Sequence, residues 1–174
     1  MKPALSFLLF IIAAWQALAA AEPLRIVVYK EARRLELRQG ETVLKSYRVG
    51  LGFAPTGHKV KQGDGKTPEG VYSICVKNSK SRFFLSLGIN YPSPADAKAG
   101  QESKLITAGE YARIVAAHNK GIAPPWDTKL GGEIFIHGNG SSTDWTWGCV
   151  ALDDAEMKDL YQRVEVGTAV EIRK

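Results

Sequence analysis

The sequence predicts a mainly β fold, a single-domain sandwich or half-barrel that carries two or three helices on its edges. Short apolar or alternating segments, separated by turns, dominate both ends of the region that follows residue 21. Only two segments combine helical periodicity with clear capping signals. Residues 22–174 are enough for one domain with a substantial core and too few for two ordinary domains.

Residues 1–21 are predicted to be a cleaved secretory signal. Lys2 precedes the apolar stretch ALSFLLFIIAAW, and QALAAAE supplies the small residues of a cleavage site. An uncleaved anchor is the alternative, but the apolar run falls short of the roughly 20 residues that a span needs. The mature chain is therefore expected to have no membrane span and to be exported, to the periplasm or the cell wall.

The strands are predicted from apolar runs and from alternation. LRIVVYK, residues 24–30, predicts a buried strand, and in RRLELRQ, residues 33–39, Leu35 and Leu37 share a face. The alternation continues over residues 41–52, where Val43 is expected to point inward. Turns such as RQGE predict an antiparallel meander. Further strands are predicted at residues 71–77, 83–91, 133–138, 149–152 and 168–174.

Two helices are predicted. Thr107 and Glu110 form a capping box for the first, and Gly121 lies beyond its end. Asp153 begins the second, with Glu156 three residues later. The expected buried faces are Tyr111, Ile114, Val115 and His118 in the first helix, and Met157, Leu160, Tyr161 and Val164 in the second. Residues 91–101 are predicted to be a loop with no more than one helical turn after Pro94.

The Gly-rich segment GHKVKQGDGKTPEG, residues 57–70, is predicted to be an irregular loop. It lacks the GxxxxGK[ST] spacing of a phosphate-binding loop. Loops of this length often carry function, although a mobile surface turn is an equal alternative.

The formal net charge of +5 falls to about +4 when Lys2 is removed with the signal. No arginine-rich arm or aromatic-basic pattern indicates a nucleic-acid partner. A mildly basic surface suits an acidic polymer or a carboxylate-rich substrate, and the sequence is compatible with a monomer.

The segment IFIHGNGSSTDWTWGCVAL, residues 134–152, carries the candidate chemistry. His137 ends an apolar strand and Cys149 begins the next, so neighbouring strand ends can bring the two side chains within hydrogen-bonding reach. A histidine beside a thiol can accept its proton and lower its pKa from about 8.5. Gly148 leaves room for backbone N–H groups to face a developing oxyanion. This pattern predicts nucleophilic catalysis by a thiol.

Other interpretations of these residues remain open. A histidine at a strand end is commonly structural, and an exported protein could join Cys75 to Cys149 in a disulfide. A zinc site would need further ligands from His58, His118, Asp144 and Asp153, which show no CxxC or HxxxH spacing. Neither a metal nor a cofactor is therefore predicted. Trp145 and Trp147 could equally be packing residues or the wall of a substrate groove.

The motifs TPEGVY, IHGNG and TWGCVAL, the last followed by a helix, resemble the L,D-transpeptidase catalytic domain of the YkuD type. The resemblance covers essentially the whole region after residue 21. It implies a β-sandwich enzyme that acts on the stem peptides of peptidoglycan and needs no cofactor.

The resemblance also implies roles for individual residues. His137 would be the general base, the Gly138 carbonyl would orient it, and Cys149 would be the nucleophile. The amides around Gly148 and Cys149 would bind the oxyanion. The residues expected to bind substrate are Thr67, Pro68, Gly70, Thr146 and Trp147.

The sequence departs from the family pattern at the acceptor side of the site. The family's box is [Ser/Thr]-His-Gly-Cys, whereas here Trp147 takes the place of that histidine and Ala151 that of a polar residue. The interval between His137 and Thr146 is also shorter. We therefore predict acyl transfer through a Cys149 thioester to an amine, which gives 3→3 cross-links. The alternative is a hydrolase: a carboxypeptidase, endopeptidase or amidase. A non-catalytic wall-binding module and a disulfide-bonded exported domain are further alternatives.

Overall fold

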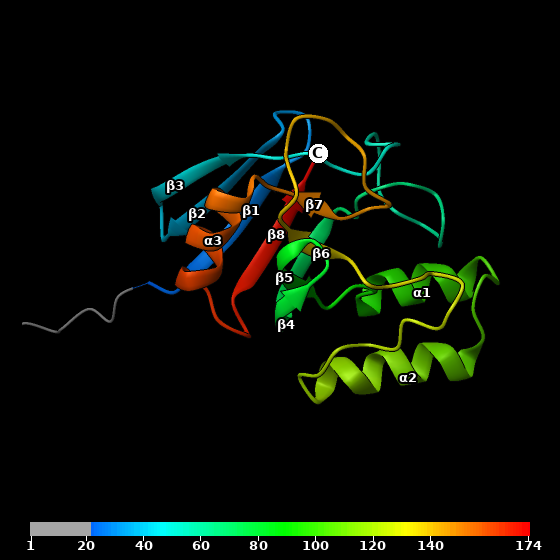
Figure 1. Ribbon diagram of the computed structural model, residues 1–174. Helices are drawn as coiled ribbons and strands as arrows, with labels where there is room; N and C mark the ends of the chain where they lie inside the picture. Colours follow the sequence, from blue (N-terminus) through cyan, green and yellow to red (C-terminus); the bar gives the residue numbers. More distant parts are fainter. Residues whose placement is uncertain (1–21) are drawn as a thin grey trace, which may run out of the picture.

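The computed structural model describes residues 22–174 (Figure 1), so the predicted signal over residues 1–21 lies outside the described residues. Eight strands and three helices follow one another along the chain. They are β1 (Leu24–Tyr29), β2 (Arg34–Gln39), β3 (Thr42–Arg48), β4 (Gly70–Ser81), β5 (Phe84–Ile89), α1 (Pro94–Glu102), α2 (Ala108–Asn119), β6 (Phe135–His137), β7 (Val150–Ala151), α3 (Asp154–Arg163) and β8 (Ala169–Arg173).

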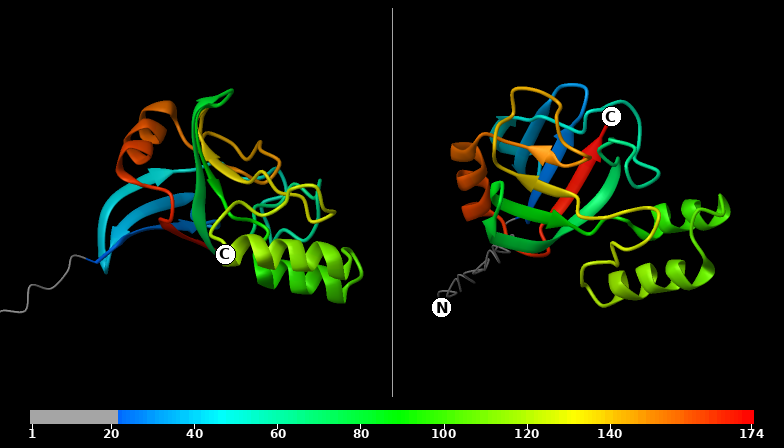
Figure 2. Two further views of the ribbon diagram at one scale, coloured as in Figure 1. Left: turned by 90° about the horizontal axis from the view of Figure 1, so that it is seen from below. Right: turned by 45° about the vertical axis from the view of Figure 1, so that its right-hand side comes forward.

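The eight strands form one mixed sheet in the order β3-β2-β1-β8-β4-β5-β6-β7. The long strand β4 joins its two halves, because Gly70–Ser73 pair with β8 and the later residues pair with β5. Figure 2 shows the half with β1–β3 and the half with β5–β7 set at a steep angle, with α3 beside the first. The core between them includes Ile26, Leu87 and Leu160. The prediction of a mainly β single domain is confirmed.

The pairing directions were predicted only in part. The antiparallel meander β1-β2-β3 is confirmed. Two pairs are parallel instead, β1 with β8 and β6 with β7. The parallel strands need a crossover between them, and the loop over residues 138–149 provides it for β6 and β7. This second pair places the candidate catalytic residues.

The expected inward orientation of Val43 is wrong, since this side chain is 44% exposed. Leu35 and Leu37 are fully buried, as predicted, and in β3 the buried residue is Tyr47. A bulge between β2 and β3 explains the difference, because the register shifts between Leu37 and Arg38. One extra residue moves the side chains beyond it to the other face of the strand.

The loop predicted over residues 91–101 is instead the nine-residue helix α1. Ser93 caps it, and Ser93 and Asp96 form a reciprocal capping box, with Pro94 in the first turn. Helix α1 lies beside α2 at one edge of the molecule (Figure 1). The two helices share a small apolar cluster that includes Ala97 and Ile114.

The two predicted helices are confirmed with their bounds nearly unchanged. Thr107 and Glu110 form the expected capping box of α2. In α3 the predicted stripe is buried at Met157, Leu160 and Val164. Asp153 stands at the N-cap of α3, but its carboxylate accepts hydrogen bonds from Ser141 and makes no capping bond to the helix.

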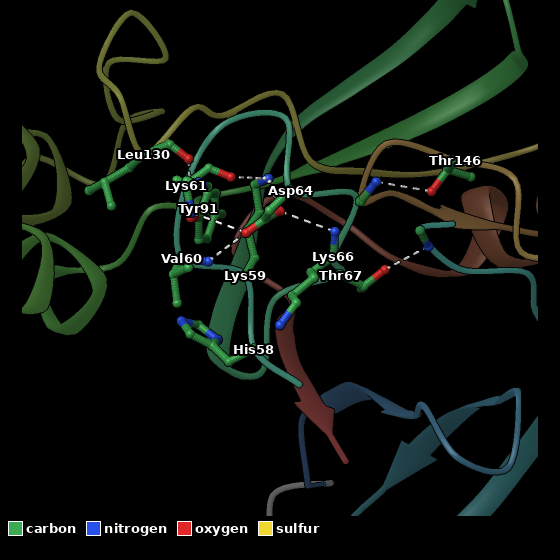
Figure 3. A network of polar contacts seen from close by, with 12 residues as sticks. His58, Lys59, Val60, Lys61, Asp64, Lys66, Thr67, Tyr91, Leu130 and Thr146 are labelled. Carbon is green, nitrogen blue, oxygen red and sulfur yellow. Dashed lines mark hydrogen bonds and ion pairs between the residues drawn. The ribbon is translucent and has the colours of Figure 1, made fainter. Parts of the chain in front are cut away.

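A buried carboxylate organises the Gly-rich loop of residues 57–70 (Figure 3). The oxygens of Asp64 accept hydrogen bonds from the backbone N–H groups of Val60, Lys61 and Lys66 at 2.8–3.1 Å. They also pair with Lys59 at 3.0 Å, and both side chains are under 8% exposed. Burial by itself raises the pKa of Asp64, but these N–H groups and Lys59 outweigh it, so the pKa lies below its usual value. The loop is therefore a shaped element rather than a loose turn.

Replacing Asp64 by Asn should destabilise the fold by about 3–5 kcal/mol at pH 7, because it leaves the buried Lys59 without its counter-charge. Because the folded-state pKa of Asp64 is depressed, its contribution is present above the unfolded pKa and is lost as pH falls through the folded one. Urea unfolding at pH 7 and at increasingly acid pH should show the gap between wild type and variant narrowing. Asp127→Asn, which breaks the exposed pair with Arg113, should cost far less, because water and salt screen that pair. Equal losses in both variants would contradict the assigned role of Asp64.

Candidate active site

The parallel pair β6–β7 brings the two predicted catalytic residues to one face of the sheet. Ile136 lies opposite Val150, and His137 lies opposite Ala151. Side chains two residues apart in an extended strand point the same way, so Cys149 shares the face of Ala151 and His137. Both His137 and Cys149 line a pocket of about 1370 Å³.

His137 is held in one orientation by its backbone and aromatic neighbours. Its Nδ1 lies 2.7 Å from the carbonyl oxygen of Gly138, which can only accept, so Nδ1 carries the proton. The ring stacks on Phe83 at 4.7 Å between centroids and meets Trp145 edge-on at 5.5 Å. Burial lowers the pKa of His137. The imidazole is therefore neutral at pH 7, with the lone pair on Nε2 free to accept a proton.

Cys149 is a protonated thiol in this arrangement. Its Sγ accepts a hydrogen bond from the Phe135 N–H at 3.4 Å and lies 3.6 Å from the Glu133 carbonyl oxygen, to which it donates. Burial raises the pKa of Cys149 to about 11. Within residues 22–174 no hydrogen bond joins Sγ to His137. The predicted thiolate–imidazolium pair is therefore not present in this structure, because desolvation acts on both groups against their charged forms.

The turn that carries the nucleophile is fixed by threonine side chains. Thr146 Oγ1 accepts from the Gly148 N–H at 3.1 Å and donates to the Cys149 carbonyl at 2.8 Å. Gly148 has φ +128°, and a Cβ there would lie 2.7 Å from the Lys66 carbonyl oxygen, so only glycine fits. The Gly148 amide is already paired, so it is not a free oxyanion donor here.

Three residues expected to bind substrate lie outside the pocket. Thr67 is fully buried, and its Oγ1 accepts from the Gly52 N–H at 3.0 Å. Pro68 is also buried, whereas Gly70 is exposed at the start of β4. The pocket lining includes none of the three. Thr67 supports the nucleophile turn, because its hydroxyl also donates to the Cys149 carbonyl oxygen at 3.5 Å.

The rim of the pocket is aromatic and charged. Trp147 is 68% exposed and meets Phe53 edge-on at 4.9 Å, while the Trp145 indole N–H donates to Gly140. Thr146, Trp145 and Trp147 line the pocket. The remaining walls were not predicted, because separate loops supply them and no local motif marks them. They include Arg82, Phe83, Trp126 and Glu133.

Both cysteines are free thiols, which removes the Cys75–Cys149 disulfide. Cys75 lies in β4 and does not line the pocket. Among the residues that the structure describes, no group of three or more His, Cys, Asp or Glu side chains is arranged to hold a metal ion. No helix within residues 22–174 is both long and apolar enough to cross a membrane.

The fold and this pocket define a thiol site on a mixed sheet, and comparison with known proteins identifies the family of the chain. The family model described as the L,D-transpeptidase catalytic domain (YkuD) matches residues 23–172. The chain therefore belongs to this family. The resemblance seen in the sequence is confirmed at the level of the family.

Individual relatives support the same assignment. YafK of Escherichia coli strain K12, a candidate L,D-transpeptidase, is 34% identical over 122 residues, which make up 65% of this chain and 50% of YafK. A second match, YafK of Escherichia coli O157:H7, has the same identity and coverage. The chain thus spans about half the length of the curated relatives that it matches.

Solved structures share the fold at low identity. The helical cell shape determining protein Pgp2 of Campylobacter jejuni superimposes with a TM-score of 0.63 and 22% identity, over 89% of this chain and 49% of Pgp2. Bd1075 of Bdellovibrio bacteriovorus gives 0.56 and 23%, over 88% of this chain and 48% of Bd1075. An L,D-transpeptidase from Mycobacterium smegmatis gives 0.51 and 12%, over 88% of this chain and 59% of its own.

The protonation state of the Cys149 thiol can be measured from the pH dependence of its alkylation rate. Because burial raises the pKa of Cys149 to about 11, reaction with iodoacetamide should be slow at pH 7 and should accelerate up to pH of about 11. His137→Ala should not move this midpoint upward, since no hydrogen bond links the two side chains. Peptide mass spectrometry separates Cys149 from Cys75 at each pH. A wild-type midpoint near 7 that rises in His137→Ala would instead establish the ion pair.

Proposed function

We propose that the chain is an exported L,D-transpeptidase that works on peptidoglycan stem peptides through a Cys149 thioester. The observation that carries the proposal is the shared face of His137 and Cys149 in one pocket, with the imidazole oriented by the Gly138 carbonyl. Family membership supports the substrate class. The names of the relatives, a candidate L,D-transpeptidase and a cell shape protein, agree with work on the cell wall.

The reaction begins with attack by Cys149 Sγ on the carbonyl carbon on the diaminopimelate side of the scissile amide. A new C–S bond forms while the thiol proton passes to Nε2 of His137, which is neutral and able to accept it. When the C–N bond breaks, His137 returns this proton to the departing D-alanine nitrogen. Proton transfer accompanies attack in this scheme, because the resting thiol is protonated.

The thioester is then resolved by a second nucleophile. An amine of another stem peptide gives a 3→3 cross-link, with His137 accepting the amine proton and the thiol leaving. Water in the same position gives hydrolysis, and the enzyme would then be a carboxypeptidase, endopeptidase or amidase. We expect Trp147 to influence whether an amine or water attacks the thioester. This side chain is 68% exposed at the rim and replaces the histidine of the family pattern.

Cys149→Ala should abolish release of D-alanine and formation of cross-linked products from defined muropeptides, read by mass spectrometry. His137→Gln should lower the rate by about 10²–10⁴-fold, the usual contribution of a positioned general base. Cys75→Ser is the matched control, because this thiol lies outside the pocket, and it should keep most of the activity. Thermal melts should show all three variants folded. Full activity in folded Cys149→Ala would reject the proposal, whereas a folded wild type that binds muropeptides without releasing D-alanine would favour a wall-binding module.

Trp147→His should alter the ratio of amine transfer to hydrolysis more than the rate of acylation. An indole donates a hydrogen bond but cannot accept a proton, so Trp147 acts as a flat wall and not as a base. The side chain is mostly exposed, so the fold should tolerate the change. Acylation is measured separately by covalent trapping of Cys149 with a carbapenem. A variant that acylates many times more slowly, with its product ratio unchanged, would assign Trp147 to the donor side.

A further inference from the structure

The turn between β4 and β5 holds a strained backbone against the catalytic histidine. Phe84 has φ +70°, a conformation that a bulky L residue rarely adopts. The turn is fixed by two hydrogen bonds, from the Phe83 N–H to Ser81 Oγ at 3.0 Å and from the Gly138 N–H to the Phe83 carbonyl at 3.1 Å. Gly138 is the residue whose carbonyl orients His137. Strain kept in this way beside a reactive group indicates a functional constraint on the turn.

The same turn places a guanidinium against the aromatic ring that stacks on the imidazole. The Phe83 ring stacks on His137 with 4.7 Å between centroids, and the guanidinium carbon of Arg82 lies 4.8 Å from the Phe83 centroid. These two short distances, laid end to end, limit how far Arg82 can be from the imidazole. Arg82 therefore lies no further from the imidazole than these two distances together, and it lines the same pocket as His137 and Cys149. Glu133 contacts the thiol through its carbonyl.

The charge of Arg82 is not neutralised within the described chain. Five charged residues line the pocket: Lys59, Lys80, Arg82, Asp127 and Glu133. Asp64 balances Lys59, and Arg113 balances Asp127. Within residues 22–174 Arg82 makes no ion pair and no side-chain hydrogen bond, and its one specific contact is the Phe83 ring. All its N–H donors therefore remain available to a ligand.

We infer that Arg82 binds the carboxylate of an α-amino acid on the amine side of the scissile bond. His137 exchanges its proton with the amine nitrogen of that group. In an α-amino acid the carboxylate carbon is two bonds from this nitrogen, about 2.5 Å away, so it must lie close to the imidazole. Arg82 lines the same pocket within this reach of the imidazole, and a guanidinium can bind a carboxylate with two parallel hydrogen bonds.

This inference rests on the proposed function and assigns a residue to the recognition of its departing amino acid. The departing group, and any amine that replaces it, would be an α-amino acid rather than a plain amine. Arg82 acts as a specificity-determining residue, because it binds the part of the substrate that distinguishes the two. An amide of a simple alkylamine offers nothing to it.

The test compares two stem-peptide analogues with the same acyl part, one releasing D-alanine and the other its neutral isostere D-alaninamide. Wild type should have the higher kcat/KM for the analogue that releases D-alanine. Arg82→Gln should lower this kcat/KM by about tenfold or more, and should change kcat/KM for the D-alaninamide analogue by no more than about twofold. Arg82→Lys should keep part of the preference, since the charge remains. Loss of the charge also raises the pKa of Cys149, but this affects both analogues equally and cancels in their ratio.

Arg34→Gln is the matched control. Arg34 is exposed, carries the same charge, lies 4.9 Å over the Tyr29 ring and is not part of the pocket lining. It should leave the preference unchanged. Equal losses on both analogues in Arg82→Gln, an equal drop in Arg34→Gln, or a wild type without preference would each overturn the inference.

A second measurement separates this inference from the proposed function. Alkylation of Cys149 by anionic iodoacetate and by neutral iodoacetamide needs no stem peptide, and Arg82→Gln should lower the ratio of their rates several-fold. If neither analogue is turned over but the ratio still depends on Arg82, the transpeptidase proposal fails and the carboxylate site stands. A ratio that Arg82→Gln leaves unchanged means that Arg82 binds no carboxylate at this site.

Discussion

The site depends on direct backbone contact between three segments that are far apart in the sequence. Gly148 lies against the Lys66 carbonyl, and a Cβ on Gly52 would overlap the Gly65 carbonyl and approach Gly148. The Thr67 hydroxyl joins these segments by accepting from the Gly52 N–H. Asp64 holds the loop in the shape that this contact needs, through its bonds to Lys59 and three backbone N–H groups. The position of Cys149 is thus set by glycines and by the buried Lys59–Asp64 ion pair.

This arrangement explains why part of the fold could be predicted and part could not. Strand β1 follows from an apolar run, and β2 with its buried leucines follows from alternation over neighbouring residues. The cap of α2 follows from Thr107 and Glu110. The signal for α1, Ser93 followed by Asp96, was present in the sequence, but the surrounding prolines and polar residues favoured a loop. Val43 was misplaced because a bulge changes the register without leaving a local mark. The parallel pairing of β6 with β7 is a long-range choice that periodicity does not encode.

In the candidate site, too, some residues could be predicted from the sequence and others could not. The His and Cys motifs are local, so His137 and Cys149 could be found from the sequence and, through the family, given roles. The motif at Thr67 was found as well, but its contribution could not be assigned, because a buried brace and a substrate ligand look alike in sequence. Arg82 and Phe83 belong to no motif. They reach the site only because the β4–β5 turn folds back onto Gly138.

The electrostatics of the pocket favour a thiol that is activated only when it reacts. Desolvation raises the pKa of Cys149 and lowers that of His137, so both groups rest in their neutral forms. A neutral thiol is slow to oxidise, which suits an enzyme that we propose to be exported. The neutral imidazole, with Nδ1–H fixed on the Gly138 carbonyl, is at the same time ready to accept a proton at Nε2. If Arg82 binds the carboxylate of the amino acid whose nitrogen exchanges a proton with His137, the arriving anion would stabilise the imidazolium that forms during attack. Substrate binding would then favour the proton transfer that burial opposes in the free enzyme, and the thiol would become nucleophilic where an acyl group is present to receive it.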